Sequence, residues 1–349
     1  METALTNSLE ENKEKLKKMF APSVDFYAKD ITICGFRACI CILEGLSSIE
    51  KMWIMTLDAL NQDAYRPKSA QDLYKYIMRK TTIPVANNIV TTCEEVLKHL
   101  TSGASLILID GFNKAIVIST QGLSYRSVSE ASGEGNLKGG KEGFIELLRI
   151  NISLIRRLIR SKLLCVETIF LGKTTQTEVA IFYHKDLVPK ELLKQVKDRL
   201  AKIDLQMIFD TGTISPFLEK DPLSLFSASG FTERPDTAAA KICEGKIVIM
   251  VNGSPFALVV PTFFCEHFQT MDDYAQRPYF ASFIRLLKYT SFLIAILLPG
   301  VFVAIANFTP ELFPPQLLYK IAASEKATPM PLFLEAIFVN FLLEIVREA

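Results

Sequence analysis

The sequence predicts an α/β (α+β) region of two small cytoplasmic subdomains, followed by α-helical transmembrane segments that form an incomplete bundle. Three observations support this fold class. Strand-like and helical runs alternate over roughly the first 260 residues, a stretch rich in Gly, Ser and charge interrupts them, and a long uncharged run follows. Hydrophobic residues make up 49% of the 349 residues, which is high for a protein that lies wholly in water. We therefore expect part of the chain to contact lipid.

The charge balance excludes one class of partner. Lys and Arg number 39 against 38 Asp and Glu, so no global positive field attracts nucleic acid. Residues 1–21 form a charged lead without the apolar segment of a secretory signal, which predicts that the following region is cytoplasmic. The seven cysteines are odd in number and lie mostly in apolar runs, which indicates buried thiols in a reducing compartment.

The first predicted subdomain covers residues 22–120. Its strand-like runs are "DITICGFRACICIL", "ASLILID" and "KAIVIST", and its helical runs are "LSSIEKMWIMTLDALN", "SAQDLYKYIMRK" and "TCEEVLKHL". The segment "IDGFNKAIVI" predicts two strands joined by a tight Asp-Gly turn. A linker or exposed loop over 121–143 follows, because "QGLSYRSVSEASGEGNLKGGKEG" has no apolar period.

The second predicted subdomain covers residues 144–260 and opens with an amphipathic helix. Its apolar stripe at helical spacing consists of Phe144, Leu147, Leu148, Asn151, Ile155, Leu158 and Ile159, and its other side carries Arg149, Arg156, Arg157 and Arg160. The stripe can pack on its own domain and leave a solvated basic face. Alternatively the basic face docks on an acidic partner or an anionic membrane, and both interpretations can hold at once. A strand pair around "GKTTQTEVAIFYH", a helix "VPKELLKQVKDRLAKI" and a strand "DLQMIF" follow.

The membrane region covers residues 261–349. Nineteen residues between Lys288 and Phe308 carry no formal charge, which is enough for a helix to cross a hydrocarbon core about 30 Å thick. We expect a transmembrane helix near 288–308, kinked at Pro299; a very apolar core helix is the alternative. Positive charges before this helix predict that the preceding residues lie on the cytoplasmic side.

A second membrane helix is expected near 332–349. It contains Glu335 and Glu344, and carboxylates at membrane depth need a bundle interior, an aqueous path or an interfacial position. The chain supplies too few helices to surround them, so we expect a membrane domain that is cut short.

No catalytic, cofactor or metal constellation is found. "GKTT" at Gly172 resembles the end of a phosphate-binding loop, but Glu167 stands where that loop requires Gly. The histidines His99, His184 and His267 occur singly. We expect no enzyme, no cofactor and no nutrient pocket.

One long run resembles a known family. "RSVSEASGEGNLKGGKEGFIELLRINISLIRRLIRSKL" is similar to the region of GerA-family spore-germination receptor A subunits that combines an R-x-x-x-E-P motif with G-P-R-E-G-F and N-x-x-L-I-R-R. Matching positions are Arg126, Glu130, Glu134, Gly139, Glu142, Gly143, Phe144, Glu146, Asn151, Leu154, Ile155, Arg156 and Arg157. The blocks "TERPD", "EGKIVIMVNGSPFALVVPTFF", "FIRLLKY" and "EIVREA" resemble later family blocks in the same order.

The resemblance implies a function that the residues alone do not. It implies a subunit that works with B and C subunits in the spore inner membrane, where nutrient germinants trigger ion release; we also expect A subunits to associate with one another. A related subunit of the dipicolinic acid channel machinery, a truncated remnant that cannot gate, and an unrelated membrane-anchored enzyme remain alternatives. The sequence departs from the family where Ala131 and Gly140 replace two prolines and Lys141 replaces an arginine, which predicts a looser loop.

Coupling contacts are predicted in two motifs that the resemblance singles out. The candidate residues are Glu142, Asn151, Arg156, Arg157, Arg234, Pro235 and Asp236. Each charged residue among them can instead form an ion pair that holds its own domain together.

Overall fold

The computed structural model describes residues 4–47, 66–80, 89–118, 120, 133–134, 140–219, 227–327 and 330–348. Most of the helix predicted at "LSSIEKMWIMTLDALN" and most of the predicted linker lie outside these residues. The chain divides into two compact units, Met1–His267 and Phe268–Ala349. The first unit contains two five-stranded sheets, and the second is helical, which confirms the predicted fold class.

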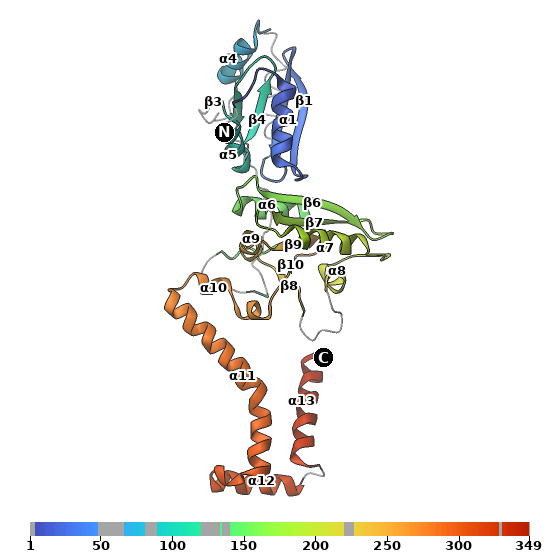
Figure 1. Cartoon of the computed structure of the whole chain (residues 1–349), viewed down its shortest axis with the longest axis vertical. Helices are drawn as coiled ribbons and strands as arrows, with labels where there is room; N and C mark the ends of the chain where they lie inside the picture. The colour runs from blue at the N-terminus through green and yellow to red at the C-terminus, as the bar shows by residue number, and fades with distance from the viewer. Residues whose placement is uncertain are drawn as a thin grey trace. The chain divides into compact units, whose positions relative to one another are not determined.

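The first module is built on an antiparallel sheet with the order β1-β2-β4-β5-β3 (Figure 1). Its strands are β1 (Phe26–Ile33), β2 (Phe36–Leu43), β3 (Ile89–Val90), β4 (Ser105–Ile109) and β5 (Ala115–Ile118). Helices α1 (Leu9–Phe20) and α5 (Cys93–Thr101) cover one face, and α4 (Ala70–Lys80) covers the other. Alternate residues of β2 and β4 enter the two cores, as the two-residue period of a strand requires.

The second module repeats this arrangement. Its strands are β6 (Leu164–Leu171), β7 (Thr177–His184), β8 (Gly230–Thr232), β9 (Ile247–Val251) and β10 (Ala257–Val260), in the order β6-β7-β9-β10-β8. Helices α6 (Leu148–Leu158) and α9 (Pro235–Cys243) cover one face, and α7 (Lys190–Ala201) and α8 (Thr211–Leu218) cover the other. Both sheets therefore place their third strand at the edge beside the fifth.

Equivalent hydrogen bonds extend the repetition to individual residues. In the first module, Asn12 accepts from the backbone N–H of Thr6 and donates to its carbonyl. In the second, Asn151 makes the same two bonds to Ile145, again six residues earlier. Both asparagines are buried, at 2% and 0% exposure, so their amides have no water to bond instead.

The turn after the fourth strand of each module is held in the same way. Asp110 accepts from the backbone N–H of Leu9 at 3.2 Å, and Asn252 accepts from that of Leu148 at 3.2 Å. The glycine that follows each turn residue has positive φ, +81° at Gly111 and +99° at Gly253. The two modules are thus two copies of one structural plan.

Helix α6 differs from its prediction. It begins at Leu148 rather than Phe144, and the predicted basic face is solvated only in part, because Arg156 is 1% exposed whereas the Arg149 side chain is 45% exposed. Leu147 and Leu158, predicted in the buried stripe, are exposed at 59% and 45%. The helix is covered by its own sheet on one side and by residues of the first module on another, so a single apolar stripe cannot describe it.

The cysteine prediction holds only in part. Cys39, Cys41, Cys93 and Cys165 are buried, but Cys243 and Cys265 are exposed. The last two stand at the end of α9 and in a short 3₁₀ helix, Phe264–Phe268, rather than in a strand.

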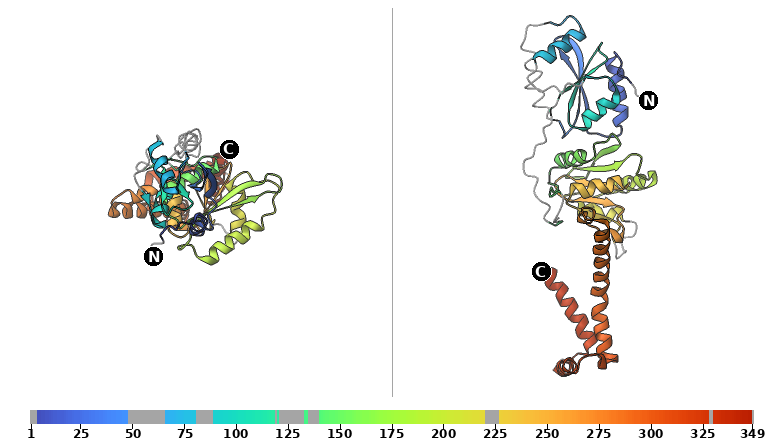
Figure 2. Two further views of the ribbon diagram at one scale, coloured as in Figure 1. Left: turned by 90° about the horizontal axis from the view of Figure 1, so that it is seen from above. Right: turned by 90° about the vertical axis from the view of Figure 1, so that its left-hand side faces the viewer.

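The second unit contains the membrane candidate. Helix α11 (Pro278–Phe308) follows α10 (Met271–Tyr274) and begins ten residues before the predicted start; it is long and apolar enough to cross a membrane. A 3₁₀ turn (Pro310–Leu312) and α12 (Pro315–Ala327) lead to α13 (Leu332–Glu348). Figures 1 and 2 show α11 and α13 joined at one end through α12.

Gly45 of the first module packs closely against α6 of the second. Its φ is +82°, and a Cβ at this position would lie 2.7 Å from the Cβ of Ser153 on α6. We predict that Gly45→Ala lowers the free energy of unfolding of residues 1–267 more than Gly35→Ala does, by about 1–3 kcal/mol, because overpacking adds to backbone strain. Urea unfolding of both variants checks this.

Gly35→Ala is the matched control. Gly35 has a similar φ of +88°, but a Cβ there meets no atom within 4 Å. An equal loss of stability in the two variants would show that strain alone acts at Gly45.

Candidate functional site: the junction of the two modules

A buried ion pair joins the modules. Arg156 on α6 donates from Nε to Asp25 Oδ2 at 2.5 Å and from Nη2 to Asp25 Oδ1 at 2.8 Å, and Asp25 immediately precedes β1. Nη2 also donates to Ser23 Oγ at 2.6 Å, and Nη1 to the carbonyl of Ser161 at 3.2 Å. Both charged side chains are 1% exposed. This bidentate contact satisfies hydrogen-bond donors of the planar guanidinium and so reduces the free-energy cost of burying the two charges. We call Ser23, Asp25 and Arg156 the bolt.

Backbone bonds extend this contact along the edge of the second sheet. The N–H of Val24 donates to the carbonyl of Val166 at 2.9 Å, and the N–H of Val166 donates to Ser23 Oγ at 3.0 Å. Lys185 Nζ donates to the carbonyl of Ala21 at 2.9 Å. The segment before β1 therefore pairs with the beginning of β6, and this covers part of an exposed sheet edge.

A second bridge lies at the surface of the same junction. Arg149 on α6 contacts Glu44, after β2, at 2.7 Å and Glu178 on β7 at 2.8 Å. Its side chain is 45% exposed, so solvent weakens these pairs and they orient more than they stabilise.

The predicted "TERPD" residues contact the linker. Arg234 pairs with Asp236 through two bonds, of 3.0 and 2.5 Å, and donates to the carbonyls of Glu134 at 3.3 Å and Gly140 at 2.7 Å. Its side chain is 3% exposed, and Pro235 is buried at the start of α9. We call Arg234, Asp236, Glu134 and Gly140 the linker anchor.

Neighbouring residues tighten the linker anchor. Thr232 Oγ1 donates to a Glu134 carboxylate oxygen at 2.7 Å, and the backbone N–H of Gly133 donates to the Glu233 carboxylate at 3.0 Å. Burial raises the pKa of Glu134 by more than the bond from Thr232 and the charge of Arg234 lower it.

The remaining predicted coupling residues lie on α6 or shortly before it in the chain. Glu142 pairs with Arg157, and the two side chains are 46% and 21% exposed. Asn151 fixes the loop before α6, as described above. The structure thus brings Asn151, Arg156, Arg157 and Glu142 together around α6, and Arg234, Pro235 and Asp236 around the N-terminus of α9.

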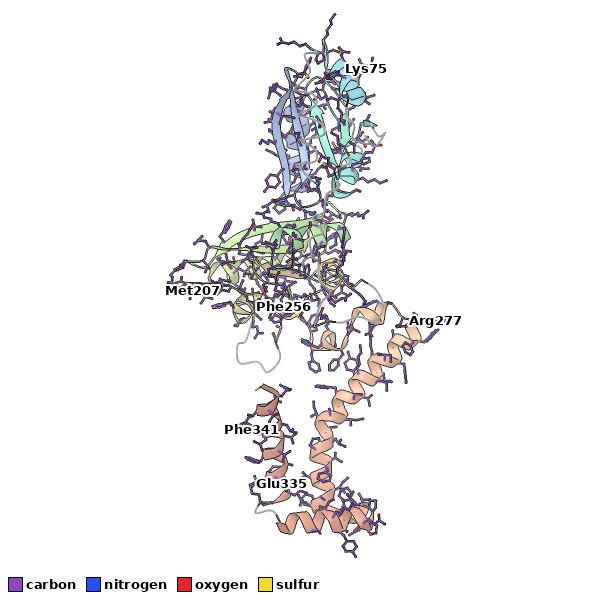
Figure 3. The ribbon with its side chains drawn as sticks, turned by 180° about the vertical axis from the view of Figure 1, so that it is seen from behind. Lys75, Met207, Phe256, Arg277, Glu335 and Phe341 are labelled. Atoms are coloured by element: carbon purple, nitrogen blue, oxygen red, sulfur yellow. The ribbon has the colours of Figure 1, made fainter. Side chains whose placement is uncertain are left out.

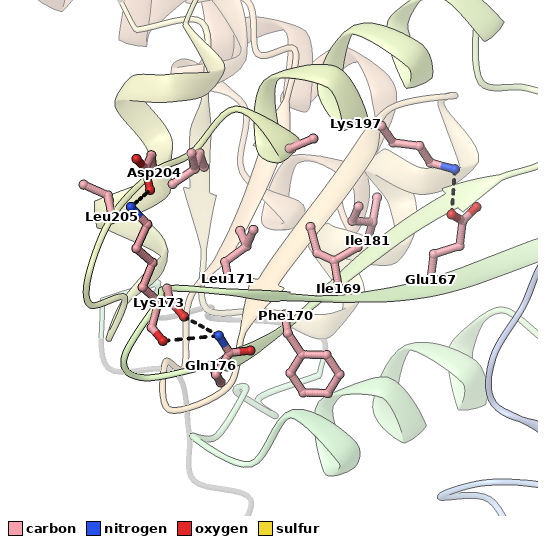
Figure 4. A pocket seen from close by; sticks show the side chains of 13 residues that line it. Glu167, Ile169, Phe170, Leu171, Lys173, Gln176, Ile181, Lys197, Asp204 and Leu205 are labelled. Atoms are coloured by element: carbon pink, nitrogen blue, oxygen red, sulfur yellow. Dashed lines mark hydrogen bonds and ion pairs between the residues drawn. The ribbon is translucent and has the colours of Figure 1, made fainter.

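A pocket of about 600 Å³ lies elsewhere in the second module, between the β6–β7 ribbon and α7 (Figure 4). Ile169, Leu171 and Ile181 supply apolar lining. Its charged lining residues are paired with each other: Lys197 with Glu167 at 2.6 Å, and Lys173 with Asp204 at 2.5 Å. Each charged side chain among the lining residues that the structure describes therefore has an ion-pair partner.

The predicted membrane residues are spread over the helical unit. Pro299 lies inside α11, Glu335 in the first turn of α13, and Glu344 pairs with Arg347 one turn later on the same helix. Figure 3 labels Glu335 and Phe341 on α13. Among the described residues, no group of three His, Cys, Asp or Glu side chains could hold a metal ion.

Sequence reasoning missed Asp25, Gly45 and Glu134 as parts of the junction. Asp25 is the one charged residue in "APSVDFYA", residues 21–28, and Arg156 is 131 residues away. One available signal was Arg156 itself, which sits among buried apolar residues in "ISLIRRL" and so requires a counter-charge.

Two α/β modules joined by a buried ion pair and followed by a long apolar helix define a two-module α/β protein with a candidate membrane helix. The family model described as "Bacillus/Clostridium GerA spore germination protein" matches residues 14–349. The chain belongs to the GerA family.

Relatives support this assignment. Spore germination protein B1 of Bacillus subtilis (strain 168) is 32% identical over 99% of this chain and 71% of its own length. Spore germination protein KA of the same organism is 34% identical over 99% of this chain and 64% of its own length. The crystal structure of the N-terminal domain of the A subunit of the Bacillus megaterium spore germinant receptor GerK3 matches 76% of this chain and 98% of that chain, with a TM-score of 0.59 and 26% identity.

We predict that Asp25→Asn destabilises residues 1–267 by about 3–5 kcal/mol, because it leaves the Arg156 guanidinium buried without a counter-charge. The double variant Asp25→Asn with Arg156→Met should lose less than Asp25→Asn alone. Urea unfolding of the single and double variants measures both effects. Arg157→Met is the control, since its partly exposed pair with Glu142 should contribute no more than about 1 kcal/mol. A double variant at least as unstable as Asp25→Asn would contradict the role of charge.

A second prediction concerns pH. Because the folded-state pKa of Glu134 is raised, the folded chain retains a proton that the unfolded chain releases. The stabilisation is full below the unfolded pKa, about 4.3, and is lost as pH rises through the folded pKa. Relative to Glu134→Gln, the wild type should therefore become less stable as pH rises from about 4 toward neutrality. Unfolding curves at a series of pH values test this, and parallel curves for the two proteins would refute it.

Proposed function

We propose that the chain is an A-type subunit of a nutrient-germinant receptor complex in the spore inner membrane. It acts with B and C subunits to couple germinant sensing to ion release during germination. The two modules lie on the cytoplasmic side and perform no catalysis in this proposal. The positive charges of Arg277, Arg285 and Lys288 before the long apolar helix support that orientation.

The observation that carries this proposal is the likeness of the two modules to the N-terminal domain of the GerK3 A subunit. That domain is described as part of a spore germinant receptor, and the match covers 98% of it. A role in spore germination follows from the family itself; the receptor complex is the step that we propose.

The junction suggests how such a subunit would work. The bolt fixes the orientation of the two modules, because the two hydrogen bonds between Arg156 and Asp25 require one relative geometry. The linker anchor fixes the chain between the modules onto α9, and β9 and β10 carry the chain from α9 to residue 260 and then to the membrane helix. A shift of the membrane helices would thus reach the linker anchor through β10, β9 and α9.

Association of A subunits is part of the proposal. Helix α13 exposes Phe333, Ile337 and Phe341, at 57%, 52% and 63%. Lipid, other helices or further copies of the chain would cover these side chains in a membrane assembly.

We predict that Arg234→Lys slows nutrient germination of spores without lowering the amount of the subunit in the membrane. Lysine keeps the charge, but its single ammonium group cannot make the bidentate pair with Asp236 and also donate to two carbonyls. Germination is measured by loss of optical density after nutrient addition, and subunit level by immunoblot. Arg37→Lys is the control, because that arginine pairs with Glu10 at the surface.

A second arm uses Arg157→Glu, which places like charges next to Glu142. Coupling through this pair predicts a slower response. Unchanged assembly and unchanged germination in this variant would remove Arg157 from the coupling path, and a normal response with Arg234→Lys would remove the linker anchor.

A further inference from the structure

Helix α11 is longer than a membrane span. Its 31 residues extend about 45 Å at 1.5 Å per residue, whereas the hydrocarbon core is about 30 Å thick. The charge-free part that follows Lys288 is sufficient to cross that core. About ten residues, 278–288, therefore remain outside the hydrocarbon.

One face of this extension is occupied by the chain segment that precedes it. Asp273, whose side chain is 4% exposed, contacts Arg285 at 3.1 Å and Lys288 at 3.2 Å. Lys288 Nζ also donates to the Phe268 carbonyl at 3.3 Å and to Thr270 Oγ1 at 3.2 Å. Segment 268–274 thus folds back on α11, and we call it the collar.

Aromatic contacts fix the collar as well. The ring of Phe268 packs on Tyr289 and Phe292, with centroids 4.8 and 5.2 Å apart, and Arg285 lies 5.2 Å from the centre of the Tyr274 ring. Burial of Asp273 raises the pKa of its carboxyl, but the hydrogen bonds from Arg285 and Lys288 lower that pKa by more. The net shift of the Asp273 pKa is therefore downward. Two cations of α11 are therefore offset at the membrane boundary.

The opposite face of the extension is apolar and uncovered. Tyr279, Phe280, Phe283 and Leu286 are exposed at 91%, 51%, 55% and 63%. Water is a poor environment for so large an apolar face. Aromatic side chains next to Arg and Lys at the end of a membrane helix are typical of the layer of lipid headgroups. Exposed Arg277 begins this stretch (Figure 3).

We propose that residues 268–288 form an interfacial element. The collar packs on one face of α11, and Tyr279, Phe280 and Phe283 on the other face enter the headgroup layer. The surface that they fit is that of a phospholipid bilayer, because the apolar face is continuous with the helix that spans it. This element fixes the depth at which α11 begins, and it goes beyond the proposed receptor function.

The test places a tryptophan reporter in the full chain. Trp53, the single tryptophan, is removed by Trp53→Phe, and Phe283→Trp is added as the interfacial reporter. A second protein carries Phe170→Trp instead as the soluble reporter, since Phe170 is similarly exposed, at 63%, on β6 of the second module. Both proteins are reconstituted into vesicles of phosphatidylcholine and phosphatidylglycerol that contain lipids brominated near the headgroup or deep in the acyl chain.

We expect the shallow bromines to quench the interfacial reporter more than the deep bromines do. We also expect the interfacial reporter to be shielded from acrylamide. The soluble reporter should be quenched by acrylamide alone. Asp273→Asn should reduce shallow quenching of the interfacial reporter and leave the soluble reporter unchanged. Quenching of both reporters by acrylamide to the same level would overturn the proposal. Shielding of the interfacial reporter from acrylamide and bromines alike would indicate a protein cover and would overturn it as well.

A carbonate wash separates this inference from the proposed membrane location. Chain released by carbonate would refute membrane insertion itself. Chain that stays with the vesicles while the interfacial reporter remains accessible to acrylamide would refute only the interfacial element.

Discussion

The buried pair of Arg156 and Asp25 is the interaction on which the first unit depends. A guanidinium and a carboxylate that are 1% exposed contribute little net stability as a pair. Removing either one is destabilising, because it leaves the other charge buried without a partner. The pair can form only if α6 is covered by both modules, which in turn requires a glycine at residue 45 and places Arg149 within reach of Glu44 and Glu178. Specific orientation of the modules, more than stability, is what this contact supplies.

The residue that precedes the corresponding helix, α5 or α9, has a different role in each module. In the first module Thr92 immediately precedes α5, and its hydroxyl accepts from the backbone N–H of Glu95 as an ordinary helix cap. In the second module Arg234 occupies the corresponding position before α9, and its side chain caps nothing. It binds Asp236 and the linker carbonyls instead. The position before this helix thus caps the helix in one copy and binds the linker in the other.

Cations near the start of α11 in the helical unit also have a counter-charge close by. Cations that precede an apolar helix favour one side of a membrane, but they also need counter-charges or headgroups close by. Asp273 supplies the counter-charge for Arg285 and Lys288 from a segment only a few residues upstream. The boundary of the membrane helix can thus be set locally, whatever neighbours α13 has in an assembly.

The sequence by itself determined the fold class, the long apolar helix and the family, because period-two strands, uncharged length and ordered motifs are properties of nearby residues. It also singled out Arg156 and Arg234. It did not determine that Arg156 is buried against Asp25, that Leu147 and Leu158 are exposed, or that the two modules repeat each other. Helical periodicity reports one packing surface, whereas α6 is covered on more than one side. Partners 131 residues apart, such as Arg156 and Asp25, leave no local pattern, so only the tertiary structure decided which charges meet.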